Sequence, residues 1–274
     1  MSAKLLLGKP CVDSMREKIL NEVKSLDCRL KLCTVGFNEP RWEQYSVSLS
    51  KSAVNYGFEC ENIVADEGIS ADDFCNVVKS ACARSDVGGV ILQQPLPKEY
   101  DLSLEHVAVA KDVDCLNPLS VANMYKGDSG FSPATPLAVL KLLDFYDIDL
   151  RGKNVVIVGR GNAVGKPLSL LMLRRDATVT VCHTKTVNLS SVCRGADVLV
   201  SACGAAGLIT CDYITEKSIV IDVGLSFVNG KTNGDVASEA YEKCLAVSPV
   251  PGGIGPITRA CLFENLLQAC KGVK

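Results

Sequence analysis

Short apolar segments alternate along this chain with longer segments in which apolar residues recur at helical spacing. The apolar segments predict buried strands at 29–36, 59–65, 88–93, 152–161, 177–182, 197–203 and 218–224. The segments between them predict helices at 18–26, 41–57, 70–86, 135–147, 163–175, 188–196 and 255–272. Strands that alternate with helices form parallel sheets whose faces the helices cover, so the sequence predicts an α/β fold.

The alternation stops near residue 120 and restarts near residue 150, which predicts two domains. We expect two three-layer αβα domains that flank a cleft. The first comprises residues 1–120 and is completed by the C-terminal helix at 256–274. The second, at 136–250, is of the Rossmann type, because strand–helix–strand units follow Gly152. A chain of 274 residues is long enough to bury both cores.

Charge and hydropathy argue against two classes of protein. The net charge of −2 argues against a nucleic-acid-binding surface, which usually carries a basic patch. No apolar run reaches the roughly 18 residues that a membrane span needs, and the N-terminal apolar stretch is too short for a signal peptide. We therefore expect a cytoplasmic protein with neither a nucleic-acid nor a membrane partner.

The fourteen cysteines are interpreted as reduced thiols that act as small hydrophobic residues. None lies in a C-x-x-C pair, and most fall in apolar strands or helices, among them Cys33, Cys82, Cys182, Cys203 and Cys261. The two histidines, His106 and His183, have no metal ligand at a suitable spacing, so no metal site is expected.

A glycine-rich turn, GRGNAVGKP at 159–167, connects the strand that ends in NVVIV to the next helix. Glycines at such a turn let the backbone approach a pyrophosphate, and the helix N-terminus offers N–H donors and a positive dipole end. The spacing of Gly159, Gly161 and Gly165 is G-x-G-x-x-x-G rather than G-x-G-x-x-G. By itself the turn fits a dinucleotide site and a plain tight turn equally well.

The residues around this turn favour NADP over NAD. An NAD site usually has an acidic residue about 20 residues further on, for the ribose 2′-hydroxyl. Here the strand at 177–182 runs into CHTKT, which offers Thr184, Lys185 and Thr186 but no acid, and Arg160 lies in the turn itself. Cations and hydroxyls suit a 2′-phosphate. The alternative is that Arg160 and Lys185 are ordinary surface residues.

Several motifs occur in one order along the chain: GVILQQPLP (89–97), KDVDCLNP (111–118), PATP (133–136), GRGNAVGKP (159–167), ATVTVCHTKT (177–186), VIDVG (220–224), GDV (234–236) and PVPGGIGPIT (249–258). This series resembles the methylenetetrahydrofolate dehydrogenase/cyclohydrolase family over nearly the whole chain. The resemblance implies a homodimer with a folate-side N-terminal domain and an NADP-binding C-terminal domain. It also implies that tetrahydrofolate derivatives are oxidised from the 5,10-methylene to the 5,10-methenyl form, which is then hydrolysed to 10-formyltetrahydrofolate, within one-carbon metabolism and purine biosynthesis.

The resemblance also implies a set of site residues. The catalytic and folate-binding positions are Tyr45, Leu49, Gln93, Asp114, Pro251, Gly252, Gly253 and Pro256. The cofactor-binding positions are Gly159, Arg160, Gly161, Val164, Gly165, Thr184, Lys185, Leu225 and Thr258. Asp114 would accept hydrogen bonds from the pterin ring, and the alternative for it is a cap or turn residue.

One departure from the family pattern bears on the chemistry. The family carries Y-x-x-x-K on its folate-side helix, and here Tyr45 is followed four residues later by Leu49. Shifting the alignment by one residue gives Ser48, which restores no lysine. Lys51 lies about 240° around the helix from Tyr45, and we expect it on the surface. Two smaller departures are Gly161, where the family often has serine, and Ala134, where it often has cysteine.

The two reactions differ in how much they need the missing lysine. Hydride loss from the methylene carbon depends mainly on positioning, whereas hydrolysis needs proton transfer, which is typically worth about 10²–10⁴-fold in rate. We expect a dehydrogenase with weak or absent cyclohydrolase activity. The alternatives are a fully bifunctional enzyme, a folate- or nucleotide-binding protein that has lost catalysis, and an unrelated Rossmann dehydrogenase.

Overall fold

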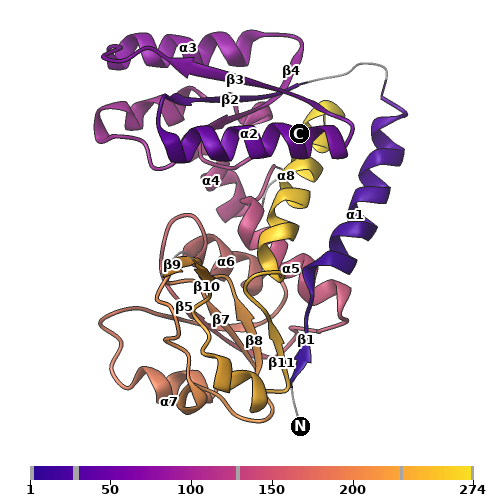
Figure 1. Ribbon diagram of the computed structural model, residues 1–274, viewed down its shortest axis with the longest axis vertical. Coiled ribbons are helices and arrows are strands. Elements are labelled where there is room, and N and C mark those ends of the chain that lie inside the picture. Colours follow the sequence, from indigo (N-terminus) through magenta and orange to yellow (C-terminus); the bar gives the residue numbers. More distant parts are fainter. Residues whose placement is uncertain (1–2, 27–30, 128–129, 229–230, 273–274) are drawn as a thin grey trace. The chain divides into compact units, whose positions relative to one another are not determined.

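The computed structural model describes residues 3–26, 31–127, 130–228 and 231–272. The chain divides into two compact units (Figure 1). Unit 1 contains Met1–Ser14 and Ala134–Cys261, and unit 2 contains Met15–Pro133 and Leu262–Lys274.

Unit 1 is built on a six-stranded parallel sheet in the order β1-β11-β8-β7-β5-β6. The strands are β1 (Lys4–Leu5), β5 (Asn154–Val158), β6 (Thr178–Cys182), β7 (Val198–Ser201), β8 (Ile219–Asp222) and β11 (Ala246–Ser248). The chain leaves β5 for β6 on one side and then passes to β7 on the other. Ligands of open α/β sheets bind at the carboxyl ends of the strands where the order reverses in this way.

Helices cover both faces of this sheet. The helical segments are α5 (Ala134–Phe145), α6 (Gly165–Leu173), α7 (Leu189–Arg194), η3 (Cys211–Tyr213) and η4 (Ser238–Glu242). Val156 and Val158 of β5 share a buried cluster with residues of α7, η3 and η4. Their neighbours Val155 and Ile157 point to the opposite face, and α6 packs against β5 and β6. The predicted three-layer Rossmann-type arrangement is confirmed. A hairpin follows β8, made of β9 (Ser226–Val228) and β10 (Lys231–Asn233).

Unit 2 contains a three-stranded parallel sheet in the order β3-β2-β4. The strands are β2 (Lys31–Phe37), β3 (Glu59–Ala65) and β4 (Val87–Leu92). The other elements are α2 (Pro40–Asn55), α3 (Ala71–Ala83), η1 (Lys98–His106), η2 (Val109–Lys111) and α4 (Pro118–Lys126). Figure 1 shows α2 and α3 on opposite sides of β2 and β3. The α3 side buries Phe74 and Val78 against strand residues such as Val35 and Val90.

Two helices contribute to both units. These are α1 (Gly8–Val23) and α8 (Ile254–Cys270). Within unit 2, Phe263 of α8 stacks on Tyr56, with the ring centroids 4.7 Å apart. A Cβ at Gly89 would lie 2.6 Å from Cγ1 of Val113 and 2.9 Å from Cδ1 of Leu266 in α8, so glycine at this position leaves room for both side chains.

The domain boundaries differ from the predicted ones at both ends of the chain. Residues 1–14 group with unit 1, because β1 pairs with β11, whereas we expected residues 1–120 to form one domain. The last helix starts at Ile254 rather than at 256, and only its part from Leu262 belongs to unit 2. The pairing of β1 with β11 could not be predicted, because strands of two and three residues are too short to show periodicity in the sequence.

Helix α3, which the sequence predicts at 70–86, begins with a side-chain cap. Ser70 precedes the helix in an extended conformation, and its hydroxyl accepts a hydrogen bond from the Asp73 backbone N–H at 3.1 Å. Such a cap satisfies one of the N–H groups that a helix leaves without an intrahelical partner.

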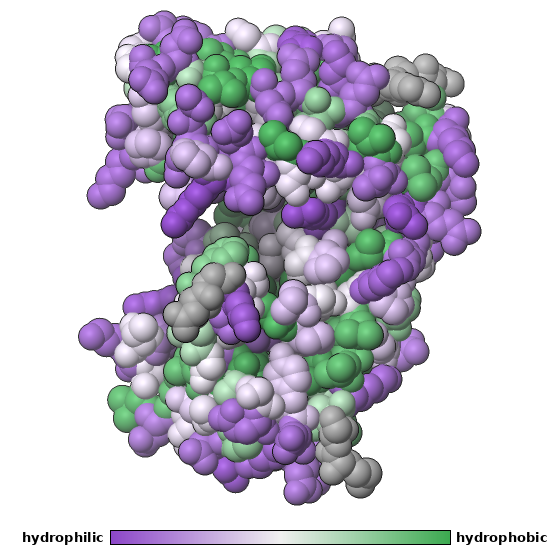
Figure 2. Space-filling view, in the orientation of Figure 1, coloured by the Kyte–Doolittle hydropathy of each residue, from purple (hydrophilic) through white to green (hydrophobic). Residues whose placement is uncertain are grey.

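On the face drawn in Figure 2, hydrophilic side chains cover much of both units, and hydrophobic ones lie scattered among them. Within the described ranges, no helix is long and apolar enough to cross a membrane.

Among the five cysteines singled out from the sequence, Cys33, Cys182 and Cys261 are buried and Cys82 is half-buried. Cys203 is exposed, which contradicts its assignment to a buried strand. It follows β7, which ends at Ser201, and so lies in the loop beyond the sheet.

Candidate functional site

The glycine turn after β5 is closed by backbone contacts that exclude side chains at two of its three glycines. Gly159 has φ +124°, and a Cβ there would lie 2.4 Å from the carbonyl oxygen of Ala202. A Cβ on Gly165 would lie 2.0 Å from the carbonyl oxygen of Gly159. Gly161 has open space around it, so this position tolerates the serine that the family often carries.

The turn leads directly into α6. Its cap residue, Val164, provides no side-chain hydrogen bond to the first turn, so the positive end of this nine-residue helix faces the turn without a capping side chain. Tight backbone packing at Gly159 and Gly165, together with a helix N-terminus that no side chain caps, fits a pyrophosphate group.

The predicted cations lie at the same edge of the sheet as the turn. Val158 at the end of β5 pairs with Cys182 at the end of β6. Arg160 lies two residues after Val158, and Thr184 lies two residues after Cys182. Arg160, Thr184 and Lys185 are exposed. The turn that carries Thr184 and Lys185 is closed by the His183 N–H, which donates to the Thr186 hydroxyl at 2.9 Å.

Two buried aspartates had no role assigned from the sequence: Asp222, the last residue of β8, and Asp235, which follows β10. Asp222 and Asp235 are both fully buried. Burial raises the pKa of Asp222 to about 6. Both belong to motifs of the family series, VIDVG and GDV, and an acid at the end of an apolar strand is the signal that could have identified Asp222.

The PVPGGIGPIT segment is fixed to the start of α1 within unit 1. The Gly8 N–H donates to the carbonyl oxygen of Gly252 at 2.8 Å, and a Cβ on Gly8 would lie 2.0 Å from the carbonyl oxygen of Gly253. Pro251 and Pro256 are exposed on this segment.

The two remaining cofactor-side candidates differ in exposure. Thr258 is half-buried in α8, with its hydroxyl 3.4 Å from the Ile254 carbonyl oxygen. Leu225 is 61% exposed.

In unit 2, several contacts orient the loop that carries Asp114. The carboxylate of the buried Asp112 accepts hydrogen bonds from the N–H groups of Leu116 and Asn117, at 2.9 and 2.8 Å. Burial raises the pKa of Asp112. Cys115 has φ +57°, a conformation that few non-glycine residues adopt. Asp114 itself is only half-buried. The hydrogen bonds of Asp112 therefore fix the loop that carries Asp114.

A second anchor of this loop comes from α8. The side-chain amide of the buried Asn265 donates to the carbonyl oxygens of Val113 and Ser132, at 2.8 and 2.9 Å. Asn265 and Asp112 were both missed from the sequence, because a carboxylate or amide that binds backbone leaves no periodic signal.

Gln93 links the end of β4 to the start of α2. Its side chain is buried, with Oε1 accepting from the Phe37 N–H at 2.7 Å and Nε2 donating to Glu39 at 2.5 Å. Glu39 is the residue that precedes α2, so Gln93 helps to set where this helix begins.

On α2, Tyr45 and Leu49 differ sharply in exposure. Tyr45 is 41% exposed, whereas Leu49 is 1% exposed on the buried helix face. Lys51 is exposed, as expected from its angle around the helix. The apolar Leu49 side chain can neither donate nor accept a proton.

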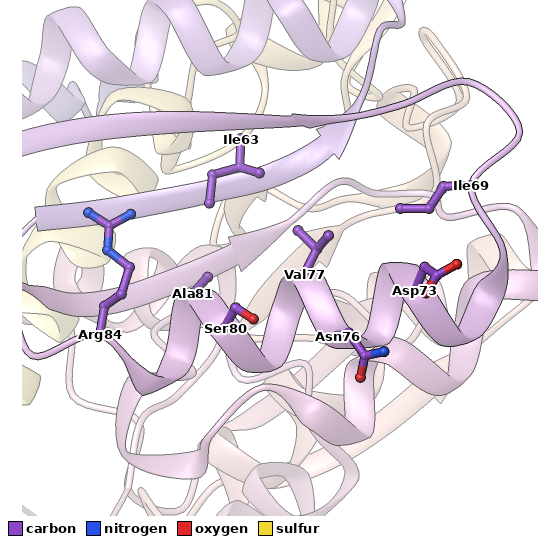
Figure 3. Close-up of a pocket in the computed structure, with 8 residues that line it drawn as sticks. All are labelled: Ile63, Ile69, Asp73, Asn76, Val77, Ser80, Ala81 and Arg84. Carbon is purple, nitrogen blue, oxygen red and sulfur yellow. The ribbon is translucent and has the colours of Figure 1, made fainter.

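A groove on unit 2 lies between β3 and α3 and has a volume of about 590 Å³ (Figure 3). Ile63 and Val77 point toward each other across it, with Arg84 at one end and Asp73 at the other. Its lining contains none of the predicted site residues. Arg84 is held in bidentate contact with Glu61, so its positive charge is already paired within the protein.

Comparisons with known proteins agree with the geometry of both units. Residues 6–114 match the family model of the tetrahydrofolate dehydrogenase/cyclohydrolase catalytic domain. Residues 133–274 match that of the NAD(P)-binding domain of the same family. The bifunctional protein FolD of Clostridium novyi (strain NT) is 40% identical over 275 residues, which cover 97% of this chain and 98% of the relative.

Solved structures show the same fold. The bifunctional enzyme FolD, a methylenetetrahydrofolate dehydrogenase/cyclohydrolase, from Campylobacter jejuni matches with a TM-score of 0.95 and 36% identity, covering 99% of each chain. FolD of Trypanosoma brucei, complexed with NADP cofactor and an inhibitor, matches with a TM-score of 0.91 and 28% identity, covering 99% of this chain and 98% of that one. The chain belongs to the tetrahydrofolate dehydrogenase/cyclohydrolase family.

Proposed function

We propose that this protein oxidises 5,10-methylenetetrahydrofolate to 5,10-methenyltetrahydrofolate by hydride transfer to NADP+. The observation that carries the proposal is the turn after β5, where Gly159 and Gly165 permit the backbone packing that a pyrophosphate site needs. The bound nicotinamide supplies the hydride acceptor. The residues of this chain bind and orient the two reactants, and positioning of this kind accounts for much of the rate in such a transfer.

The preference for NADP+ over NAD+ is assigned to Arg160, Lys185 and Thr184. These side chains are exposed at the ends of adjacent strands, and the segment that contains Lys185 carries no acid to bind a ribose 2′-hydroxyl. The NADP bound to the Trypanosoma brucei relative supports the same preference.

The folate-binding role is assigned to residues of unit 2 and to the PVPGGIGPIT segment. Asp114 would accept hydrogen bonds from the pterin, and the contacts of Asp112 and Asn265 that fix its loop support this role. Tyr45 stacks on Trp42 and leaves 41% of its surface exposed, which would contact the ligand. Gln93 would act indirectly, because its hydrogen bonds to Phe37 and Glu39 fix the start of α2. The residues proposed to line the ligand from the PVPGGIGPIT segment are Pro251, Gly252, Gly253 and Pro256.

Cyclohydrolase activity is proposed to be weak or absent. Hydrolysis of the methenyl group requires proton transfer at the attacking water, and Leu49 occupies the position of the family lysine with 1% of its surface exposed. The bifunctional names of the relatives make full activity the competing hypothesis.

Two variants on α2 distinguish these hypotheses. Leu49→Lys should raise the rate at which added methenyltetrahydrofolate decays by about 10²-fold or more, while Ser48→Lys, one residue away and half-buried, should not. Decay followed by the methenyl absorbance measures this rate, and NADPH formation shows that each variant is folded. Fast decay with the unmodified protein would overturn the proposal.

The protein is also proposed to form a homodimer. In the described part of unit 2, β3 pairs with β2 on one side only, so its other edge presents backbone groups that a second copy can pair with. Val64 of this strand is 56% exposed. Light scattering of the purified protein should give twice the mass of one chain, and Val64→Lys should lower it toward the monomer; a monomeric unmodified protein would refute this assignment.

A further inference from the structure

Asp235 has an unusual number of backbone hydrogen-bond partners in one loop. Its carboxylate accepts from the N–H groups of Cys203, Gly204 and Ala205, at 2.9, 3.3 and 2.7 Å. It also accepts from the Ser201 hydroxyl at 2.9 Å. The side chain is fully buried, so this single group fixes the whole loop that follows β7.

Asp222 holds Asp235 in place. Its carboxylate accepts from the N–H groups of Gly224, Asp235 and Val236, at 3.0, 3.0 and 2.9 Å. Both carboxylates are closely enclosed, because a Cβ on Gly224 would lie 2.0 Å from Cγ of Asp235 and a Cβ on Gly234 would lie 2.0 Å from Oδ2 of Asp222. The two side chains therefore act in series, with Asp222 fixing the backbone that presents Asp235.

The loop that Asp235 fixes is in contact with the glycine turn. A Cβ on Gly159 would lie 2.4 Å from the Ala202 carbonyl oxygen, and the Ala202 N–H donates to the Val158 carbonyl oxygen at 2.8 Å. On its other side, the Gly204 carbonyl oxygen accepts from the Ser226 hydroxyl at 2.9 Å. Ser226 is next to Leu225, one of the predicted cofactor contacts. Movement of the loop would therefore reach both the turn and Leu225.

We propose that Asp235, held by Asp222, is a positioning residue for the dinucleotide, because it keeps the loop after β7 in the conformation that the glycine turn and the segment around Leu225 require. This inference rests on the proposed function of unit 1. An asparagine at position 235 would place an amide NH₂ against at least one backbone N–H donor, so it breaks at least one of the hydrogen bonds while keeping the size of the side chain.

The test compares Asp235→Asn with Asp112→Asn by calorimetric titration with NADP+ and, separately, with tetrahydrofolate. Asp112 is a matched control, because it is also a buried carboxylate that accepts backbone N–H groups, but in the loop that carries Asp114. Asp235→Asn should raise the Kd for NADP+ by about tenfold or more and leave the Kd for tetrahydrofolate within about twofold. Asp112→Asn should instead raise the Kd for tetrahydrofolate by about tenfold or more and leave the Kd for NADP+ within about twofold.

A purely structural role predicts that both variants lose thermal stability without this selective change in ligand binding, and that result would overturn the inference. If Asp235→Asn does not fold, Ser201→Ala removes a single donor to Asp235 and should raise the Kd for NADP+ by about two- to fivefold; an unchanged Kd would refute the inference. An unmodified protein that binds no NADP+ refutes the proposed function as well, whereas an unchanged Kd in Asp235→Asn refutes the inference alone.

Discussion

Gly165→Ala should weaken dinucleotide binding strongly, because the added methyl group meets backbone atoms rather than the end of a flexible side chain. The new Cβ would lie 2.0 Å from the carbonyl oxygen of Gly159, 2.7 Å from its carbonyl carbon and 3.1 Å from Cα of Arg160. Carbon atoms in contact are normally about 3.5–4.0 Å apart, so α6 and the turn must separate by more than about 1 Å. This separation would open the turn that we assign to the pyrophosphate.

The size of the effect follows from the cost of overpacking, which is typically about 1–3 kcal/mol. If the overpacking destabilises only the closed conformation of the turn, the Kd for NADP+ rises by roughly 5- to 150-fold, because about 1.4 kcal/mol corresponds to a tenfold change in Kd. Fluorescence or calorimetric titration with NADP+ measures the change, and circular dichroism establishes that the variant is folded.

Gly161→Ala is the matched control within the same turn. Nothing lies within 4 Å of the position that its Cβ would take, so its Kd for NADP+ should stay within about twofold of the unmodified value. If Gly165→Ala binds NADP+ normally, or if Gly161→Ala is equally damaging, the assignment of this turn to the pyrophosphate is wrong.

Three further predictions test other parts of the site. Replacing both Arg160 and Lys185 by alanine should lower kcat/KM for NADP+ by about 10- to 100-fold, because charge-assisted contacts to the 2′-phosphate are lost, and should barely change it for NAD+; an equal loss with both cofactors would contradict the assignment. Asp114→Asn should raise KM for the folate by about tenfold and leave KM for NADP+ unchanged; an unchanged folate KM would remove Asp114 from the site. Burial raises the pKa of Asp222 from 3.8 to about 6, so the folded state binds this proton more tightly than the unfolded state. The free energy of unfolding, taken relative to Asp222→Asn, should therefore fall by up to roughly 3 kcal/mol as the pH rises from about 4 to about 6. Denaturant titrations at each pH measure it, and a difference that grows with pH would refute the attribution.

The elements that could be predicted are those that the chain encodes locally. The strand before Gly159 and the helix after Gly165 follow from an apolar run, glycines and helical spacing, and Ser70 marks the start of α3 by its side chain. The pairing of β1 with β11 joins segments about 240 residues apart, and neither strand is long enough to carry a pattern.

The candidate catalytic and cofactor positions came from the family motifs, whereas the groups that hold the surrounding loops in place required the structure. Asp235 binds the N–H groups of residues 30 to 32 positions away, and Asn265 binds Val113 from 152 positions away. A polar side chain whose partners are distant backbone groups has no counterpart in local spacing. The same motif, KDVD, contains both Asp112 and Asp114, and only the structure distinguishes the buried Asp112, which fixes the loop, from the half-buried candidate Asp114.

We propose that the chain carries out only one of the two reactions of its family. One measurement tests it most directly: the unmodified protein is mixed with 5,10-methylenetetrahydrofolate and NADP+, and NADPH and the methenyl absorbance are followed together. Our account predicts that NADPH forms and that methenyltetrahydrofolate accumulates in equal amount, decaying only at its uncatalysed rate. NADPH formation in which the methenyl product disappears as fast as it forms, or no NADPH at all, would contradict it.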